Sequence, residues 1–299
     1  ASCLVGSEMC IRDSLESIVE LNPLHGPPAI SGFKACKAVM PRANHVGVFD
    51  TSYYSDLGEY AYIYPVPYEL YEKYKIRRYG FHGTSHRYVA GKAAELLGRK
   101  DAKIITCHLG NGSSITATKN GRAVDTSMGF TPQDGVPMGT RSGALDPTVV
   151  TYIMKAEGLS AEETDKLLNS KSGLLGVSGV SSDCRDVCKA AEAGNARAAL
   201  AIDILVHDIK KIIGSYFAEL DGADALVFTA GIGENDRNLR ERVCKNMSAL
   251  GIEIDEAVND SCPRGEIADI TKAGAKVKTF VIPTDEEYMI ALDTKNLTK

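Results

Sequence analysis

The chain has 299 residues, 44% of them hydrophobic and 24% charged, which is the length and composition of a globular protein with two domains. Its formal net charge of −5 disfavours a nucleic-acid partner, and no apolar run approaches the ~20 residues that span a membrane, so we expect neither a nucleic-acid nor a membrane partner. Eight scattered cysteines without a C-x-x-C, and no recognisable secretory leader, favour reduced thiols in a cytoplasmic protein over a disulfide scaffold.

The first 14 residues differ in character from the rest of the chain. They read ASCLVGSEMCIRDS, without clear periodicity or an initiator Met, and we expect a foreign, disordered leader outside the fold. From Leu15 onward the pattern predicts a short helix, a proline-rich turn over 23–28 and a second helix that ends near Pro41.

Beyond Pro41, short apolar runs alternate with helical stretches, which predicts an α/β fold. Ligands in open α/β sheets collect beyond the carboxyl ends of the strands, so the polar segments there are candidates for a site. The predicted strands are 46–49, 103–109, 225–229 and 277–283, with a further hairpin around Asn120–Gly121, and the predicted helices are 85–97, 146–157, 161–169, 196–220 and 236–247.

Two glycine-rich segments follow predicted strands. The segment 108–112, followed by two serines, suits a phosphate, and an ordinary tight hairpin explains it equally well. The segment 231–235 precedes a predicted helix, where a nucleotide could dock, although it is not a Rossmann fingerprint and the chain has no P-loop. The candidate residues are His108, Leu109, Gly110, Asn111 and Gly112, and Gly231, Ile232, Gly233, Glu234 and Asn235.

Two histidines lie four residues apart at the start of the helix predicted after residue 84, with Thr84 or Ser85 as its N-cap. His82 and His86 allow three interpretations: capping and packing, a phosphate-facing His82, or the zinc site of a hydrolase. The zinc interpretation lacks the glutamate of H-E-x-x-H.

Charged residues in other loops extend the candidate set. Arg141 ends a loop with several glycines and prolines that begins at 126, and its planar fork suits phosphoryl oxygens. Asp50 and Glu286 follow predicted strands, where carboxylates either hold Mg²⁺ with nucleotide phosphates or face helix dipoles.

The polar segment 181–186 opens another predicted helix. Capping alone would explain Asp183, which precedes Cys184 and Arg185. Cys184 and Cys188 lie four apart on this helix, and we expect them to pack rather than to bind a metal.

Taken together, these segments resemble the acetate kinase family, from about Leu15 to the C-terminus. Each motif alone is weak, whereas seven in the family's order are specific. The resemblance implies an α/β, two-domain, actin-like ATPase (ribonuclease H-like) fold that closes on a nucleotide. The motifs are F-D-T at 49–51, R-R-Y-G-F-H-G-T-S-H at 77–86, H-L-G-N-G-S-S at 108–114, D-T-S-M-G-F-T-P with M-G-T-R-S-G within 125–143, S-S-D-x-R-D at 181–186, T-A-G-I-G-E-N at 229–235 and P-T-D-E-E at 283–287.

The resemblance also implies catalytic and metal-binding roles. Asp50 matches the catalytic aspartate, and His82 and Arg141 match the groups that stabilise the transferring phosphoryl group. Glu286 matches a residue of the magnesium site.

Binding roles follow from the same resemblance. The segments 108–112, 183–185 and 231–235 match nucleotide-binding parts of the family. Leu24, Phe81 and Pro132 match an apolar pocket for the acetate methyl group, with His25 in the same family stretch as Leu24.

The implied reaction is reversible phosphoryl transfer from ATP to acetate, giving acetyl phosphate and ADP, with Mg²⁺ or Mn²⁺ as cofactor and a homodimer as the assembly. Because a carboxylate acceptor is already ionised near pH 7, Asp50 need not remove a proton, and we assign it to ordering the metal and the acetate. A propionate- or butyrate-type acyl kinase and a nucleotide-binding fragment without catalysis are the alternatives.

The sequence departs from the family at its start, because nothing matches the N-x-G-S-S-S-x-K phosphate loop with which acetate kinases begin. We therefore expect an N-terminally truncated acetate kinase with an incomplete first domain and low or no activity. In this division, residues 15–52 and 287–299 remain of the N-terminal domain, and residues 53–286 form the C-terminal nucleotide-binding domain.

Overall fold

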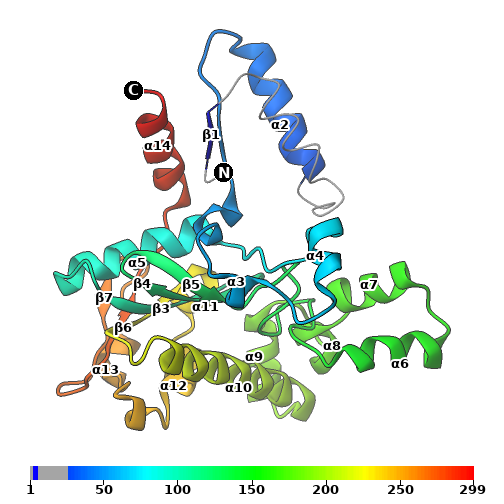
Figure 1. The fold of residues 1–299 in the computed structure, drawn as a ribbon. Coiled ribbons are helices and arrows are strands. Elements are labelled where there is room, and N and C mark those ends of the chain that lie inside the picture. Colours follow the sequence, from blue (N-terminus) through cyan, green and yellow to red (C-terminus); the bar gives the residue numbers. More distant parts are fainter. Residues whose placement is uncertain (1–2, 6–25) are drawn as a thin grey trace.

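A six-stranded mixed sheet forms the centre of this computed structural model, which describes residues 3–5 and 26–299 (Figure 1). The central strand, β3, pairs antiparallel with β4 on one side and parallel with β6 on the other. The strands in spatial order are β5 (Arg122–Thr126), β4 (Ser113–Lys119), β3 (Lys103–Leu109), β6 (Ala225–Thr229), β8 (Lys278–Val281) and β7 (Ala268–Asp269).

The pairing of β3 places the two glycine-rich segments side by side. His108 near the end of β3 is in register with Thr229 at the end of the parallel strand β6. The turn from β3 to β4 therefore leaves the sheet at the same edge as the segment after Thr229. A Cβ atom added to Gly110 would lie 3.9 Å from the Cβ of Ala230, so the two segments are in contact range.

Alternate side chains of β3 and β6 pack on opposite faces of the sheet. Ile105 and Phe228 lie in a core cluster with α10 (Ala196–Glu219). Ile104 and Val227 lie in a second cluster with α5 (Gly83–Leu97), which covers the other face (Figure 1). Because both faces are covered, these strands are continuous apolar runs, and this is why the sequence predicts them so clearly.

The remaining helices surround these two layers. α9 (Cys184–Glu192) and α12 (Arg237–Cys244) pack with α10, and α14 (Glu286–Leu297) contacts α5. In the residues that the structure describes, no helix is both long and apolar enough to cross a bilayer. The other helical elements are α2 (Gly26–Val39), the 3-10 helix η2 (Asp50–Tyr54), α3 (Glu59–Tyr62), α4 (Tyr68–Tyr74), α6 (Pro147–Glu157), α7 (Ala161–Ser170), α8 (Gly173–Ser178), α11 (Ala230–Asn235), the 3-10 helix η3 (Ser248–Leu250) and α13 (Glu256–Asp260).

A second, two-stranded sheet lies apart from the large one (Figure 1). β1 (Cys3–Val5) pairs antiparallel with β2 (Val46–Val48). Cys3–Val5, within the segment that we expect to be a disordered leader, form the strand β1 along an edge of β2. The short helix expected from Leu15 lies outside the described residues, and the second helix, α2, begins within the proline-rich turn.

Most predicted elements occur with bounds close to those expected, and 103–109 and 225–229 are strands over the predicted residues. The segment 230–235, expected as a loop, is the short helix α11 instead. The reason is a tertiary contact: the buried guanidinium of Arg240 donates to the carbonyl oxygens of Gly233 (2.9 Å) and Glu234 (2.8 Å), which satisfies the last turn.

The start of α5 also differs from the prediction. Neither Thr84 nor Ser85 is the N-cap; His82 holds that position with a left-handed φ of 57°, and Thr84 and Ser85 lie in the first turn. The free backbone N–H groups of this turn are satisfied from another element, by the carboxylate of Asp50.

Candidate active site

Asp50 lies where the chain leaves β2, against the start of α5. Its Oδ2 accepts a hydrogen bond from the backbone N–H of His82 at 2.5 Å, and its Oδ1 accepts one from Thr84 at 3.4 Å. A Cβ on the intervening Gly83 would lie 2.2 Å from the carbonyl oxygen of Asp50, so this approach requires glycine. Burial raises the pKa of Asp50, and the backbone donors partly oppose that shift. The carboxylate is therefore held in place by main chain.

The His82 ring is fixed on two sides. Its Nδ1 lies 2.8 Å from the Oγ of Ser114, and the ring stacks on that of His108 with centroids 4.2 Å apart. Burial, together with the nearby charge of Arg141, lowers the pKa of His82 to about 4. Burial and the proximity of His82 lower the pKa of His108 to about 3. Both imidazoles are therefore neutral at pH 7.

A chain of hydrogen bonds, here called the imidazole relay, continues behind His82. Ser114 Oγ also lies 2.7 Å from His86 Nε2, and His86 Nδ1 lies 2.6 Å from the Oγ1 of Thr106. Thr106 Oγ1 donates to the carbonyl oxygen of Thr116 over a longer 3.4 Å. His86, Thr106 and Ser114 are fully buried, so each link must be satisfied within the relay.

The direction of the hydrogen bonds in the relay is coupled to which nitrogen of His82 carries the proton. With Thr106 donating to Thr116, His86 Nδ1 donates to Thr106, Ser114 donates to His86, and His82 donates from Nδ1. Reversing every link puts the His82 proton on Nε2 instead and gives up only the 3.4 Å bond. The relay thus allows neutral His82 to offer an N–H on its free nitrogen when an anion lies there.

Arg141 and His82 approach the same point from different parts of the chain. A Cβ added to Gly112 would lie 3.3 Å from His82 Nε2 and 3.5 Å from Arg141 Nη1. Arg141 Nη1 is held by the carbonyl oxygen of Pro132 at 3.2 Å. A fork of N–H donors and an imidazole beside a glycine turn can together receive a phosphoryl group.

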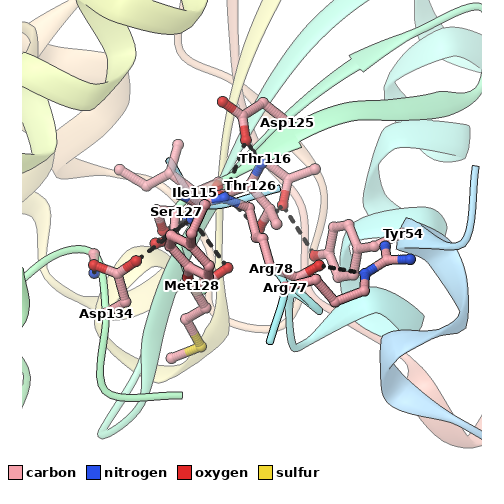
Figure 2. A network of polar contacts seen from close by, with 12 residues as sticks. Tyr54, Arg77, Arg78, Ile115, Thr116, Asp125, Thr126, Ser127, Met128 and Asp134 are labelled. Carbon is pink, nitrogen blue, oxygen red and sulfur yellow. Dashed lines mark hydrogen bonds and ion pairs between the residues drawn. The ribbon is translucent and has the colours of Figure 1, made fainter. Parts of the chain in front are cut away.

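Arg78 anchors the start of the loop that carries Arg141 (Figure 2). Its Nη1 donates to the carbonyl oxygen of Thr126 at 2.9 Å and contacts those of Ser127 and Met128 at 3.4 Å. The carboxylates of Asp125 and Asp134 lie 3.8 and 3.5 Å from the guanidinium. The loop therefore leaves β5 in a fixed direction.

Carboxylates from two other elements lie near this edge of the sheet. Glu234 Oε1 accepts from the N–H groups of Ala230 (2.8 Å) and Thr284 (3.3 Å), and so joins the end of β6 to the segment before α14. Burial, followed by the charge of Asp50, raises the pKa of Glu286. Glu286 therefore lies near enough to Asp50 for its pKa to respond to that charge, and both residues offer the carboxylate oxygens that divalent cations such as Mg²⁺ prefer.

The segments expected to bind nucleotide also meet. A Cβ on Gly139 would lie 2.3 Å from the Oδ1 of Asn111 and 2.7 Å from the carbonyl oxygen of Ser182, so the turn 110–112, the Arg141 loop and the start of α9 are in contact. Asp183 is the N-cap of α9: its Oδ1 accepts from the N–H of Arg185 at 2.9 Å, and its carboxylate pairs with the exposed guanidinium of the same residue.

The model of the family described as "Acetokinase family" matches residues 1–292. The chain belongs to the acetokinase family.

Relatives of known name agree with this acetokinase assignment. The chain is 53% identical over 296 residues to an acetate kinase of Methanosarcina barkeri, covering 98% of this chain and 71% of that one. It is 55% identical over 291 residues to an acetate kinase of Treponema denticola, covering 97% and 73%.

Solved acetokinase structures have the same fold. The structure of Porphyromonas gingivalis acetate kinase matches with a TM-score of 0.95 and 47% identity, covering all of this chain and 75% of that one. A propionate kinase from Francisella tularensis matches with a TM-score of 0.93 and 41% identity, covering 99% and 75%. The expected α/β fold of the actin-like ATPase type is thereby confirmed.

Not every residue expected at the acetokinase site presents its side chain there. Leu109 and Cys184 are buried in the apolar core, and Ile232 packs against it, so any contact of these three with a nucleotide is through backbone. Leu24 and His25, expected near the acyl group, lie outside the described residues, while Phe81 is fixed by a 2.8 Å bond from Tyr54 Oη to its carbonyl oxygen.

The imidazole relay is not among the features that the sequence predicts. Its signal was present, because Thr106 and His108 share one face of an otherwise apolar strand, and Ser114 and Thr116 share one face of its neighbour. Buried polar side chains in such a position need partners, and α5 supplies most of them: His86 lies between Thr106 and Ser114, and Ser85 Oγ lies 2.8 Å from His108 Nδ1.

Proposed function

We propose that this chain is an acetate kinase, which transfers the γ-phosphoryl group of ATP to acetate and catalyses the reverse reaction. One observation supports the transfer chemistry best: the free nitrogen of His82 and the guanidinium of Arg141 both lie within about a hydrogen bond of the space above Gly112. Phosphoryl transfer depends mainly on positioning and on neutralising charge on the equatorial oxygens, and these two side chains supply both.

Each of three side chains has a role that follows from its chemistry. Arg141 provides a permanent positive charge and two parallel N–H donors, which suit two phosphoryl oxygens. His82 adds one N–H donor, with the imidazole relay holding its other nitrogen. Asp50 orients the acceptor and the metal-bound waters, because an acetate oxygen is already ionised near pH 7 and needs no base.

The metal ion proposed for this site is Mg²⁺, with Mn²⁺ as a substitute. Asp50 and Glu286 fit this ion because both offer hard carboxylate oxygens. Burial also destabilises the negative charge of each carboxylate, as its raised pKa indicates, and a bound cation would relieve that cost. When bound, the ion neutralises phosphate charge. We further propose a cytoplasmic homodimer as the working form.

The test is a hydroxamate assay with ATP, Mg²⁺ and acetate. We expect acetate-dependent product, its loss in Arg141→Ala, and normal rates in the control Arg122→Ala, which alters an arginine whose side chain is 75% exposed. ATP binding by calorimetry without product in any condition would identify a nucleotide-binding fragment without catalysis and refute the proposal.

A longer acyl substrate is the second candidate, and the similarity to the Francisella tularensis propionate kinase supports it. Comparing kcat/KM for acetate, propionate and butyrate separates the two. A higher value for propionate or butyrate than for acetate would reassign the substrate and leave the phosphoryl-transfer site unchanged.

A further inference from the structure

Two cysteines and an aspartate form a compact cluster between the starts of α9 and α12. Cys184 and Cys188 lie one turn apart on α9, and Asp236 is the N-cap of α12. The two Sγ atoms are 4.0 Å apart, and Cys188 Sγ lies 3.9 Å from Asp236 Oδ2. In the described part of the chain this is the one group of three such ligand atoms within 4.8 Å of one another.

The spacing matches that of a tetrahedral metal site. Zinc binds thiolate sulfur at about 2.3 Å and carboxylate oxygen at about 2.0–2.2 Å, so tetrahedral ligands should be separated by about 3.8 Å for S···S and about 3.5 Å for S···O. The two separations that involve Cys188 exceed these values by only a few tenths of an ångström, and the third, between Cys184 Sγ and the Asp236 carboxylate, is within 4.8 Å. Small side-chain rotations therefore suffice to close the site around an ion.

Neither a disulfide nor apolar packing accounts for the whole cluster. A disulfide needs sulfur atoms about 2.05 Å apart, which would require a large displacement of two side chains fixed on successive turns of one helix. Packing accounts for Cys184, which is 4% exposed and lies in the core, but Cys188 is only partly buried and its sulfur faces a carboxylate. The Cys188 thiol donates a long hydrogen bond to that carboxylate, 3.9 Å from sulfur to oxygen, and a metal ion that replaced the thiol proton would have the same two atoms as ligands.

We propose that Cys184, Cys188 and Asp236 bind one thiophilic divalent cation of the Zn²⁺ class, with water as the fourth ligand. The site differs in chemistry from the Mg²⁺ site proposed at Asp50 and Glu286, because thiolates select soft ions and carboxylates alone select hard ones. Binding at the cluster does not depend on the proposed kinase activity.

Because of where the cluster lies, we expect a bound ion to affect nucleotide binding. Cys184 directly follows Asp183, and Asp236 directly follows the segment 231–235. An ion held between them cross-links the start of α9 to the start of α12, and so joins two of the three segments expected around the nucleotide. We therefore expect a bound ion to change the affinity for ADP while leaving the hydroxamate assay's requirement for Mg²⁺ intact.

The experiment uses Cd²⁺ as the probe on the full chain, kept reduced with a phosphine and freed of metal by a chelator. We expect one Cd²⁺ per chain, detected by the thiolate-to-cadmium absorption band, and displacement by Zn²⁺. Cys188→Ser should weaken Cd²⁺ binding at least 100-fold. Cys36→Ser, which alters an exposed cysteine elsewhere, is the matched control and should bind as the unaltered chain does.

A third variant separates metal binding from folding. Asp236→Asn keeps the N-cap, because an amide oxygen can still accept from the N–H of Leu239, and it removes the charged ligand, so we expect about 10-fold weaker binding. Unchanged Cd²⁺ affinity in Cys188→Ser or Asp236→Asn, or loss of the band in Cys36→Ser, would overturn the assignment.

Discussion

Replacing Ser114 with alanine tests the imidazole relay. Its hydroxyl serves two rings at once, at 2.8 Å from His82 Nδ1 and 2.7 Å from His86 Nε2, and its side chain is fully buried. Alanine leaves the Nε2 of His86 without a partner in a site that water does not reach. Leaving one buried polar group unsatisfied lowers the free energy of unfolding by about 1–3 kcal/mol.

The same variant should slow catalysis by a separate route. Without Ser114, neutral His82 no longer has a partner that stabilises the tautomer with its proton on Nε2, and the ring loses one of its two positional restraints. We expect kcat to fall about 10- to 100-fold, equivalent to roughly 1.4–2.7 kcal/mol of transition-state stabilisation, with a smaller change in the KM for ATP.

The control is Thr118→Val on the same strand. Thr118 is fully buried, and its hydroxyl lies 3.0 Å from Tyr53 Oη, outside the relay. Urea unfolding and steady-state hydroxamate assays on both variants separate the effects: both should lose stability, and only Ser114→Ala should lose kcat. Equal kcat values in the two variants would refute the role assigned to the relay.

Three further predictions concern Arg141, His82 and Thr279. Arg141→Lys should lower kcat at least 100-fold with ATP affinity nearly unchanged, because one ammonium cannot replace two parallel donors; a rate above a tenth of normal would contradict this. The pKa of His82 is about 4 when folded, against an ordinary value of 6.5, so between these values the unfolded chain binds the extra proton and the free energy of unfolding falls as pH falls. In His82→Asn the loss of unfolding free energy between pH 7 and pH 4.5, measured by urea unfolding, should be smaller by up to roughly 3 kcal/mol. An equal loss in both proteins would show that the His82 ring contributes none of it. Thr279→Val should raise the free energy of unfolding by about 1 kcal/mol, since Thr279 Oγ1 is the buried side-chain oxygen without a hydrogen-bond partner among the described residues, whereas a lower urea midpoint would argue against that.

The sheet was largely predictable because its strands are buried on both faces. Lys103–Leu109 and Ala225–Thr229 are apolar throughout most of their length, and such runs bounded by glycine turns are readily recognised as strands. The ends of these strands also located the polar segments that the fold brings together. The segments that follow neighbouring parallel strands lie at the same edge of the sheet, and the order of strands and helices along the sequence was enough to predict this.

Contacts that depend on register or on distant side chains were not predictable. The relay needs Thr106 and Ser114 on adjacent strands to lie on either side of His86 from α5, a placement that depends on strand register and helix packing and that no periodicity reveals. In the same way, glycines disfavour a helix at 230–235 by about 1 kcal/mol each, and contacts that include the guanidinium of Arg240, from the next helix, offset that preference.

The missing side chain at Gly139 lets three distant stretches of chain meet at this edge of the molecule. The turn at Asn111, the Arg141 loop and the residue before Asp183 occupy the space that a side chain at position 139 would fill, so they pack together only while that residue is glycine. A bulkier residue at this one position would force all three stretches apart in a single step.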